Sequence, residues 1–361
     1  MVRCTVYNLA HKSVEVLTCI KRGGKVMRLK KLAAVGMAVV MSAALLAGCS
    51  SKSGSSDAQK KVGVVQLVEH DALDAAYKGF KDGLADAGYK DGDKIKIEYK
   101  NAQNEQSNCQ TIAQQFVTDK CDLVLAIATP AAQAMANETK DIPILVTAVT
   151  DPADAKLVKS NEKPGTNVSG TSDLTPVKKQ MGLLKELVPN AKKVAMLYCS
   201  AEANSKFQVE IAKKEAKKLG LESVDATVSE SSEIRQVVES LKGKVDAIYS
   251  PTDNMIAAGI NTVSMVANEA KIPFIVGEEG MCTGGGLATY GVNYYKLGKQ
   301  TAAQAVKILE GKSEPKDMPI EYQENADLII NKDTVKKLGI KIPEKLQKQA
   351  KMVTTQKKTD K

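Results

Sequence analysis

Apolar runs alternate with amphipathic segments along most of this chain. The run KKVGVVQL at 60–67 is rich in β-branched residues. The segment after it places apolar side chains on one face of a helix, at Leu73, Tyr77, Phe80, Leu84 and Ala87. Continuous apolar strands are typical of parallel sheets that helices cover on both faces. The alternation of such strands with helices therefore predicts an α/β fold.

The same pattern occurs twice. KKVGVVQL recurs as KKVAMLYC at 192–199, and the segment from Asp122 (DLVLAIATPAAQAMANETKDIPILV) recurs from Asp246 (DAIYSPTDNMIAAGINTVSMVANEAKIPFIV). Each member of the second pair consists of a strand, a polar turn, a helix, Ile-Pro and a strand. Chance similarity of two generic units is the alternative, but the shared ANE and Ile-Pro favour a duplication. We expect two doubly wound lobes with parallel sheets.

The order of the segments predicts that the chain crosses between these lobes several times. Lobe 1 is expected to comprise 62–172 and about 290–323, including a helix at 294–309 and a short strand at 318–322. Lobe 2 is expected to comprise 173–289 and about 324–343. A hinge with several crossings is a common geometry for closure around a ligand. The lysine-rich tail at 344–361 is expected to be a frayed, solvated helix.

The N-terminal segment has the pattern of a secretion signal. Lys30 and Lys31 precede an uncharged run at 32–48, which ends in Leu-Ala-Gly before Cys49. This resembles a bacterial lipobox, in which the cysteine is lipidated and becomes the mature N-terminus. A short transmembrane anchor is the alternative, although 17 residues lie at the lower limit for spanning. We expect residues 1–48 to be leader and signal peptide, with the true start at Met27, and 49–61 to be a flexible tether. The folded part would then lie outside the cell membrane, anchored to its outer face through Cys49.

The distribution of charge argues against nucleic-acid binding. The chain of 361 residues has a formal charge of +9. Residues 1–48 hold eight basic residues and one acidic residue, and 345–361 hold six and one, so the body between them carries −3. A basic leader and tail do not form a basic surface for DNA.

Few residues of the mature chain could bind a metal or perform catalysis. Beyond Cys49, four cysteines remain, and they lack the spacing of a metal site: Cys109, Cys121, Cys199 and Cys282. They could form disulfides in three pairings, but we expect small buried side chains instead. His70 is the single histidine after residue 49, which excludes a two-histidine metal site. The glycines at 284–286 lack the lysine and the spacing of a phosphate loop. These counts argue against an enzyme, and we expect no cofactor.

Ligands of open α/β sheets bind beyond the carboxyl ends of the strands, which selects a small set of turns. The candidate residues in these turns are Glu69, His70, Thr129, Ala131, Ala132, Thr150, Asp151, Asp173, Asn204, Asp253, Asn254 and Glu278. Thr129-Pro130 predicts a helix start, where Thr129 can cap and the backbone N–H groups of Ala131 and Ala132 can attract an anion. An ordinary cap is the alternative there, and also for Asp253.

The candidate turns contain several acids and few lysines. Asp151, Asp173, Asp253 and Glu278 are expected near one cleft. Together with one helix N-terminus they suit a zwitterion, whose carboxylate would meet N–H groups and whose ammonium would meet an acid. The sequence does not decide which acid binds the ammonium, nor whether His70 contacts the ligand or only completes a turn. Three tyrosines near strand ends could stack on a ligand or belong to the core: Tyr198, Tyr249 and Tyr290.

Several stretches resemble one family. The stretches are QLVEHDALDAAYKGFKDGL from Gln66, ATPAAQAMA from Ala128, VTDP from Val149, YCSAEANS from Tyr198, PTDN from Pro251, and GEEG from Gly277 with YGVNYYKLG from Tyr290. The chain from Val62 to about Pro343 resembles the bacterial ABC-transporter substrate-binding lipoproteins of the tryptophan/tyrosine type. That resemblance implies a periplasmic-binding-protein fold of type I.

The resemblance also implies a function. The expected ligand is an aromatic amino acid (Trp, Tyr or Phe), and the expected partner is an ABC permease. The pocket positions that it implies are Thr129, Ala131, Thr150, Asp151, Asn204, Asp253, Asn254 and Glu278. We expect a monomer attached to the membrane by lipid. The alternative is a sugar, nucleoside or other small solute on the same fold, which the aromatic content of 4% and the absence of tryptophan make less favoured.

Overall fold

The structure is a computed structural model that describes residues 59–356. The expected leader, the lipidation site Cys49, nearly all of the tether and the last five residues lie outside the described residues. None of the described helices is long and apolar enough to cross a membrane.

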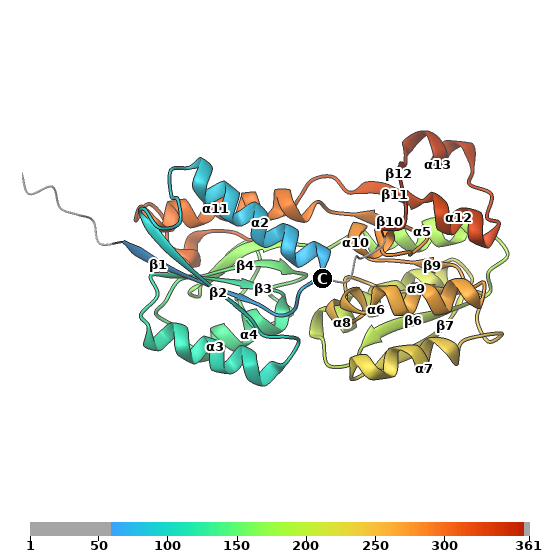
Figure 1. Cartoon of the computed structure of the whole chain (residues 1–361), viewed down its shortest axis with the longest axis horizontal. Helices are drawn as coiled ribbons and strands as arrows, with labels where there is room; N and C mark the ends of the chain where they lie inside the picture. Colours follow the sequence, from blue (N-terminus) through green and yellow to red (C-terminus); the bar gives the residue numbers. More distant parts are fainter. Residues whose placement is uncertain (1–58, 357–361) are drawn as a thin grey trace, which may run out of the picture. The chain divides into compact units, whose positions relative to one another are not determined.

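The first sheet is entirely parallel and forms the core of one α/β unit. Its strand order is β2-β1-β3-β4-β5. The strands are β1 (Lys60–Gln66), β2 (Ile95–Asn101), β3 (Leu123–Ile127), β4 (Ile144–Val149) and β5 (Val168–Ser172). Every residue of β3, β4 and β5 is buried, as the apolar runs of β3 and β4 predict, although β5 (VSGTS) is mostly polar. Figure 1 shows α2 (Asp71–Asp86) and α11 (Tyr294–Leu309) on one face of this sheet, and α3 (Gln106–Thr118) and α4 (Thr129–Glu138) on the other.

The second sheet is parallel except for one pair of strands. Its order is β12-β11-β10-β9-β8-β6-β7, in which β10 and β11 are antiparallel. The strands are β6 (Lys193–Cys199), β7 (Glu222–Val228), β8 (Ala247–Tyr249), β9 (Phe274–Ile275), β10 (Ala288–Gly291), β11 (Asp327–Asn331) and β12 (Lys351–Val353). The accompanying helices are α5 (Val177–Leu187), α6 (Ala203–Lys218), α7 (Ile234–Glu239), α8 (Asn254–Ala258), α9 (Ile260–Glu269), α10 (Glu279–Thr283), α12 (Lys332–Leu338) and α13 (Glu344–Gln349). The predicted fold class, α/β with two mostly parallel sheets, is confirmed.

The chain passes between the two sheets three times. It leaves the first sheet after β5, returns after β10 to form α11, and leaves again after Glu321, whose backbone bridges Thr171. Two details differ from the expectation. Residues 290 and 291, expected at the start of the second segment of lobe 1, belong to the second sheet, because β10 pairs with β9 and β11. The strand expected at 318–322 is a single bridge at Glu321, because the rest of that segment pairs with no strand of the described chain.

The C-terminal segment is not the frayed helix that its lysines suggest. After the short helix α13, β12 pairs in parallel with β11 and forms the edge of the second sheet. Leu346 is buried, and the Gln356 N–H donates to the Thr283 carbonyl at 2.9 Å. The prediction from the local charge pattern is wrong for the described part of this segment, because burial of Leu346 and pairing of β12 with β11 stabilise it.

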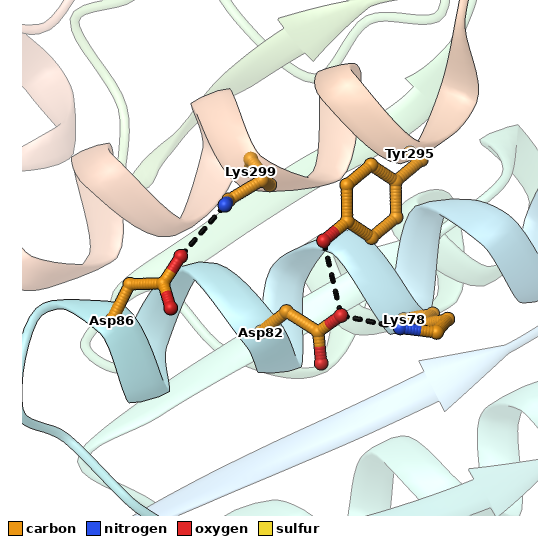
Figure 2. A network of polar contacts seen from close by, with 5 residues as sticks. All are labelled: Lys78, Asp82, Asp86, Tyr295 and Lys299. Atoms are coloured by element: carbon orange, nitrogen blue, oxygen red, sulfur yellow. Dashed lines mark hydrogen bonds and ion pairs between the residues drawn. The ribbon is translucent and has the colours of Figure 1, made fainter.

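Glycines allow α2 and α11 to lie in close contact. A Cβ at Gly79 would lie 2.0 Å from the Tyr295 carbonyl oxygen, and one at Gly298 would lie 2.0 Å from the Ala76 carbonyl oxygen. Polar contacts flank this interface (Figure 2): the Tyr295 hydroxyl donates to Asp82 at 3.1 Å, Lys78 also contacts Asp82, and Lys299 pairs with Asp86 at 2.6 Å. The close approach fixes the start of α11 beside the N-terminal part of α2, where the candidate site lies.

The four cysteines of the described chain are buried and form no disulfide: Cys109, Cys121, Cys199 and Cys282. Burial raises the pKa of the Cys109 and Cys199 thiols to about 11. They are therefore unreactive thiols, as expected for small buried side chains.

Candidate functional site

Strand ends of both sheets surround one buried cavity. Its lining residues are His70, Leu73, Ala148, Asp173, Thr252, Asp253, Asn254, Ala257, Glu278 and Tyr294. Its volume is about 10 Å³, which is about enough for one water molecule. Of the residues singled out in the sequence, the structure brings five to this cavity: His70, Asp173, Asp253, Asn254 and Glu278.

Two side-chain hydrogen bonds connect turns of the first sheet with turns of the second. His70 Nε2 lies 3.4 Å from Asn254 Oδ1, which joins the turn after β1 to the start of α8. Gln208 on α6 donates from Nε2 to the Thr150 hydroxyl at 3.2 Å and to the Thr252 hydroxyl at 2.7 Å. The turns after β4 and β8 are thus linked through Gln208, a residue that the sequence did not indicate.

Asp173 is a buried acid whose carboxylate accepts hydrogen bonds from two hydroxyl groups. Its Oδ1 accepts a hydrogen bond from Thr150 at 3.1 Å, and its Oδ2 accepts one from the Tyr294 hydroxyl at 2.6 Å. Burial raises the pKa of Asp173, and both hydroxyls counter that effect in part. A carboxylate can accept about four hydrogen bonds, so Asp173 can still receive a charged donor from the cavity.

Asp253 and Glu278 instead cap helices. Asp253 accepts the N–H of Ile256 at 2.8 Å at the start of α8, and also the N–H of Cys199 and the hydroxyl of Ser205, both at 2.7 Å. Asp253 is therefore an ordinary helix cap in this structure, the alternative given above for this residue.

Glu278 caps α10 in the same way, since it accepts the N–H groups of Gly280 and Met281. Burial raises the pKa of Glu278 to about 7.

Glu202 lies in the turn at 200–205, one of those that the rule of ligand binding at strand ends selects, but it is not among the candidate residues given above. It is buried in the turn between β6 and α6, within the stretch YCSAEANS. Its carboxylate accepts the Met255 N–H at 3.1 Å, the N–H and side-chain amide of Asn254, and the Asn204 amide at 3.0 Å. Burial and the nearby charge of Asp253 raise the pKa of Glu202 to about 8. An acid in a turn at a strand's carboxyl end was the available signal.

The start of α4 differs in detail from the prediction. Thr129 is the first helical residue rather than the cap, and its hydroxyl is buried without a hydrogen-bond partner among residues 59–356. The Ala132 N–H donates to the Ala128 carbonyl at 3.0 Å and is therefore used within the helix. Ala128 itself has φ 81° and ψ 152°, a strained conformation for a residue other than glycine. The N–H groups of Thr129 and Ala131 remain as potential donors to an anion.

Other candidates lie away from the cavity. Glu69 is exposed, and Asp151 organises its own loop by accepting N–H groups of Ala153 and Asp154 and the amide of Asn161, each at 3.0 Å. Tyr249 is a core residue whose hydroxyl donates to Gln180 at 2.8 Å.

Tyr198 and Tyr290 are half-buried and do not line the cavity. The tyrosine that does line it, Tyr294, was not predicted, because its position depends on how α11 packs against α2.

The titratable side chains around the cavity are mostly acidic. The four buried acids, Asp173, Glu202, Asp253 and Glu278, form no ion pair with any lysine or arginine of the described chain. Buried carboxylates are costly unless a cation or several hydrogen bonds compensate them. The arrangement is therefore suited to a ligand that brings a positive charge.

Two mostly parallel sheets with a buried acidic cavity at their strand ends define a solute-binding protein of the periplasmic type. The family model for the ABC transporter substrate binding protein matches residues 61–354, and the chain belongs to this family. Over 321 residues it is 49% identical to a tyrosine-binding protein of Clostridioides difficile (strain R20291), covering 86% of this chain and 93% of that protein.

Two solved structures are also similar. The chain is 42% identical to an ABC domain from Streptococcus pneumonia in complex with L-Trp, with a TM-score of 0.79 and coverage of 81% and 99% of the two chains. It is 48% identical to the ligand-free, open structure of a substrate-binding protein with adhesive properties from Clostridium difficile, with a TM-score of 0.64 and coverage of 82% and 100%.

These findings confirm the family that the sequence motifs indicated. The chain is a substrate-binding protein and not an enzyme, since its family and its structural neighbours bind solutes. Proteins of this family are extracytoplasmic.

Proposed function

We propose that this protein binds an aromatic amino acid between the strand ends of its two sheets and delivers it to an ABC permease. The observation that carries the proposal is the group of buried acids without a basic partner in the described chain. The start of α4, which follows β3 of the first sheet, offers N–H groups for the opposite charge. An amino acid has the matching zwitterion. The tyrosine-binding relative and the L-Trp complex narrow the side chain to an aromatic one.

Each charged end of the ligand has a proposed partner. The carboxylate meets the N–H groups of Thr129 and Ala131 at the start of α4, where the helix dipole favours an anion. The ammonium meets Asp173, whose carboxylate is hydrogen-bonded by hydroxyl groups and does not cap a helix. Charge-assisted hydrogen bonds at both ends would provide much of the affinity.

The described arrangement is proposed to be the closed form. In sequence, the chain is more similar to the open, ligand-free neighbour (48% identity) than to the L-Trp complex (42% identity). In structure it is closer to the L-Trp complex, with a TM-score of 0.79 against 0.64 for the open neighbour. The bonds from His70 to Asn254 and from Gln208 to Thr150 would break on opening. A cavity of about 10 Å³ cannot admit an amino acid, so entry requires this opening.

A ligand panel tests the proposal. Binding to the native state alone raises the melting temperature, and a micromolar Kd corresponds to about −8 kcal/mol. We expect L-tyrosine, L-tryptophan or L-phenylalanine to raise the melting temperature of the chain from residue 50 onward, and glucose and uridine to leave it unchanged. Isothermal titration calorimetry then gives the Kd. A shift with glucose or uridine alone would favour a sugar or nucleoside ligand instead.

Lipid anchoring and the monomeric state complete the proposal. Cys49 lies outside the described residues, and its support is the Leu-Ala-Gly-Cys sequence. In a bacterial host, Cys49→Ser is expected to abolish incorporation of labelled palmitate and to release the protein from the membrane fraction. Light scattering of the chain from residue 50 is expected to give the mass of one copy.

A further inference from the structure

Two buried amide side chains on α6 each leave an oxygen without a hydrogen bond. Asn204 is 6% exposed and Gln208 is fully buried, and they lie one helical turn apart. Asn204 Oδ1 and Gln208 Oε1 accept no hydrogen bond from any residue of the described chain. Since a buried unpaired acceptor costs about 1–3 kcal/mol, two such oxygens on one helix face indicate a place for a donor from outside the chain.

The donors of both amides fix which atom is the oxygen. Asn204 Nδ2 donates to the Glu202 carboxylate at 3.0 Å and to the Thr252 carbonyl at 3.2 Å. Gln208 Nε2 donates to the backbone carbonyl of Asn204 at 3.3 Å, and also to the Thr252 and Thr150 hydroxyls. Backbone carbonyl oxygens can only accept, so neither amide can be turned round without losing its bond to the carbonyl of Thr252 or of Asn204.

The pair lies beside the cavity. Thr252 lines the cavity and receives hydrogen bonds from both amides, one to its carbonyl and one to its hydroxyl. Thr150 is shared by Gln208 and Asp173, since it accepts from Gln208 and donates to Asp173. The Gln208 amide is therefore connected to Asp173, the proposed ammonium partner, through Thr150, and Asn204 is connected to Gln208 through its backbone carbonyl. Both amides are neutral.

We propose that Asn204 and Gln208 together accept a hydrogen bond from a neutral donor on the ligand's ring, the phenol O–H of tyrosine or the indole N–H of tryptophan. This inference rests on the proposed function. An ammonium buried here needs an anion, which Asp173 supplies, whereas neutral amide oxygens suit a neutral donor. Phenylalanine would bury the same two oxygens without pairing them, so the site selects against it.

Calorimetry with three amino acids tests the inference on the unmodified protein from residue 50 onward. A site built for a substrate O–H or N–H rejects the analogue that lacks it far more strongly than an apolar pocket would. We expect L-phenylalanine to bind about 100-fold or more weakly than L-tyrosine or L-tryptophan. Equal affinity for all three overturns the inference and leaves the proposed function standing. Absence of binding to any of the three overturns the proposed function and the inference with it.

Two substitutions separate ring recognition from a structural role. Gln208→Met and Asn204→Leu remove the oxygens at similar volume and are expected to weaken L-tyrosine binding at least tenfold while leaving L-phenylalanine within about threefold. Gln304→Met is the matched control, because Gln304 on α11 is also buried with an unpaired oxygen but lies away from the cavity. Gln304→Met should keep the wild-type ratio of the Kd for L-phenylalanine to the Kd for L-tyrosine. An equal loss of affinity for all three ligands in the α6 variants would show a structural role and overturn the inference. If one variant does not fold, the other variant and the wild-type ratio of the Kd values decide.

Discussion

Asp173 differs from the other buried acids in what it contacts. Asp253 and Glu278 hold backbone N–H groups at helix starts, whereas Asp173 accepts hydrogen bonds from the hydroxyls of Thr150 and Tyr294. A ligand ammonium can therefore approach Asp173 without dismantling a helix cap. This contrast could not be read from the sequence, in which all three residues are acids at strand ends.

Replacing Asp173 tests this difference. Hydrogen bonds to charged groups contribute about 1.5–3 kcal/mol, so Asp173→Asn is expected to weaken L-tyrosine binding about 10- to 150-fold in calorimetry. Asp86→Asn, which removes an exposed acid on α2, should leave the Kd within twofold. A Kd for Asp173→Asn equal to that of the wild type would assign the ammonium to another acid.

Ala128 stores strain next to the proposed carboxylate site. Its φ of 81° costs an alanine about 1–2 kcal/mol and costs glycine little. Ala128→Gly is therefore expected to stabilise the protein by about 1 kcal/mol, measured as a higher urea midpoint. Ala303→Gly, at an exposed position within α11, should lower the midpoint by a similar amount. A lower midpoint for Ala128→Gly would show that the side-chain contacts of Ala128 outweigh its strain.

The sequence predicts residues well where the local pattern decides their role. The cap at Asp253 and the buried strands follow from short-range rules. Glu202, Gln208 and Tyr294 gain their roles from contacts with residues far away in the chain, such as the bond from Tyr294 to Asp173 across 121 positions. Capping and periodicity rules do not include such contacts, so Gln208 and Tyr294 were missed, and Glu202 was indicated only as part of a turn at a strand end.

Among the elements, the pair α2 and α11 depends on glycine. At Gly298 an added Cβ would lie 2.0 Å from the Ala76 carbonyl and 2.8 Å from the Phe80 nitrogen, both backbone atoms that cannot move aside easily. Gly298→Ala is expected to destabilise the protein by about 2–3 kcal/mol, seen as a lower urea midpoint. The matched control is Gly182→Ala in α5, where nothing lies within 4 Å of the new Cβ. It should stabilise by about 0.5–1 kcal/mol, and a loss as large as that of Gly298→Ala would contradict the explanation.

Element prediction succeeded for long apolar runs and failed at sheet edges. Strands such as β3 and β4 are buried along their whole length, so the hydrophobic pattern alone specifies them. The edge strand β12 is three residues long and mostly exposed, and its partner is β11. Its formation depends on that partner and on the bond from Asn331 to Thr355, neither of which a window around 351–353 contains.

At the scale of the whole molecule, the acids around the cavity couple folding to pH. Burial raises the pKa of Glu278 to about 7, and burial together with Asp253 raises that of Glu202 to about 8. Both groups titrate near 4.5 when unfolded, so the native state binds more protons than the unfolded state between these values. The free energy of unfolding of the unliganded protein therefore falls as pH rises from about 5 to 8. A bound ammonium would favour the charged acids, so ligand binding should release protons and tighten over the same range.

Urea unfolding and calorimetry between pH 5.5 and 8.5 measure both effects. The unliganded protein should be less stable at pH 8.5 than at pH 5.5, and L-tyrosine should bind more tightly at pH 8.5. Glu202→Gln removes one titrating group and is expected to reduce the pH slope of stability by up to ~1.4 kcal/mol per pH unit. Glu239→Gln, an exposed control on α7, should leave the slope unchanged. A wild-type stability that increases with pH across this range would mean that the buried acids are already charged in the unliganded protein, and that the hydrogen bonds to Glu202 outweigh its burial.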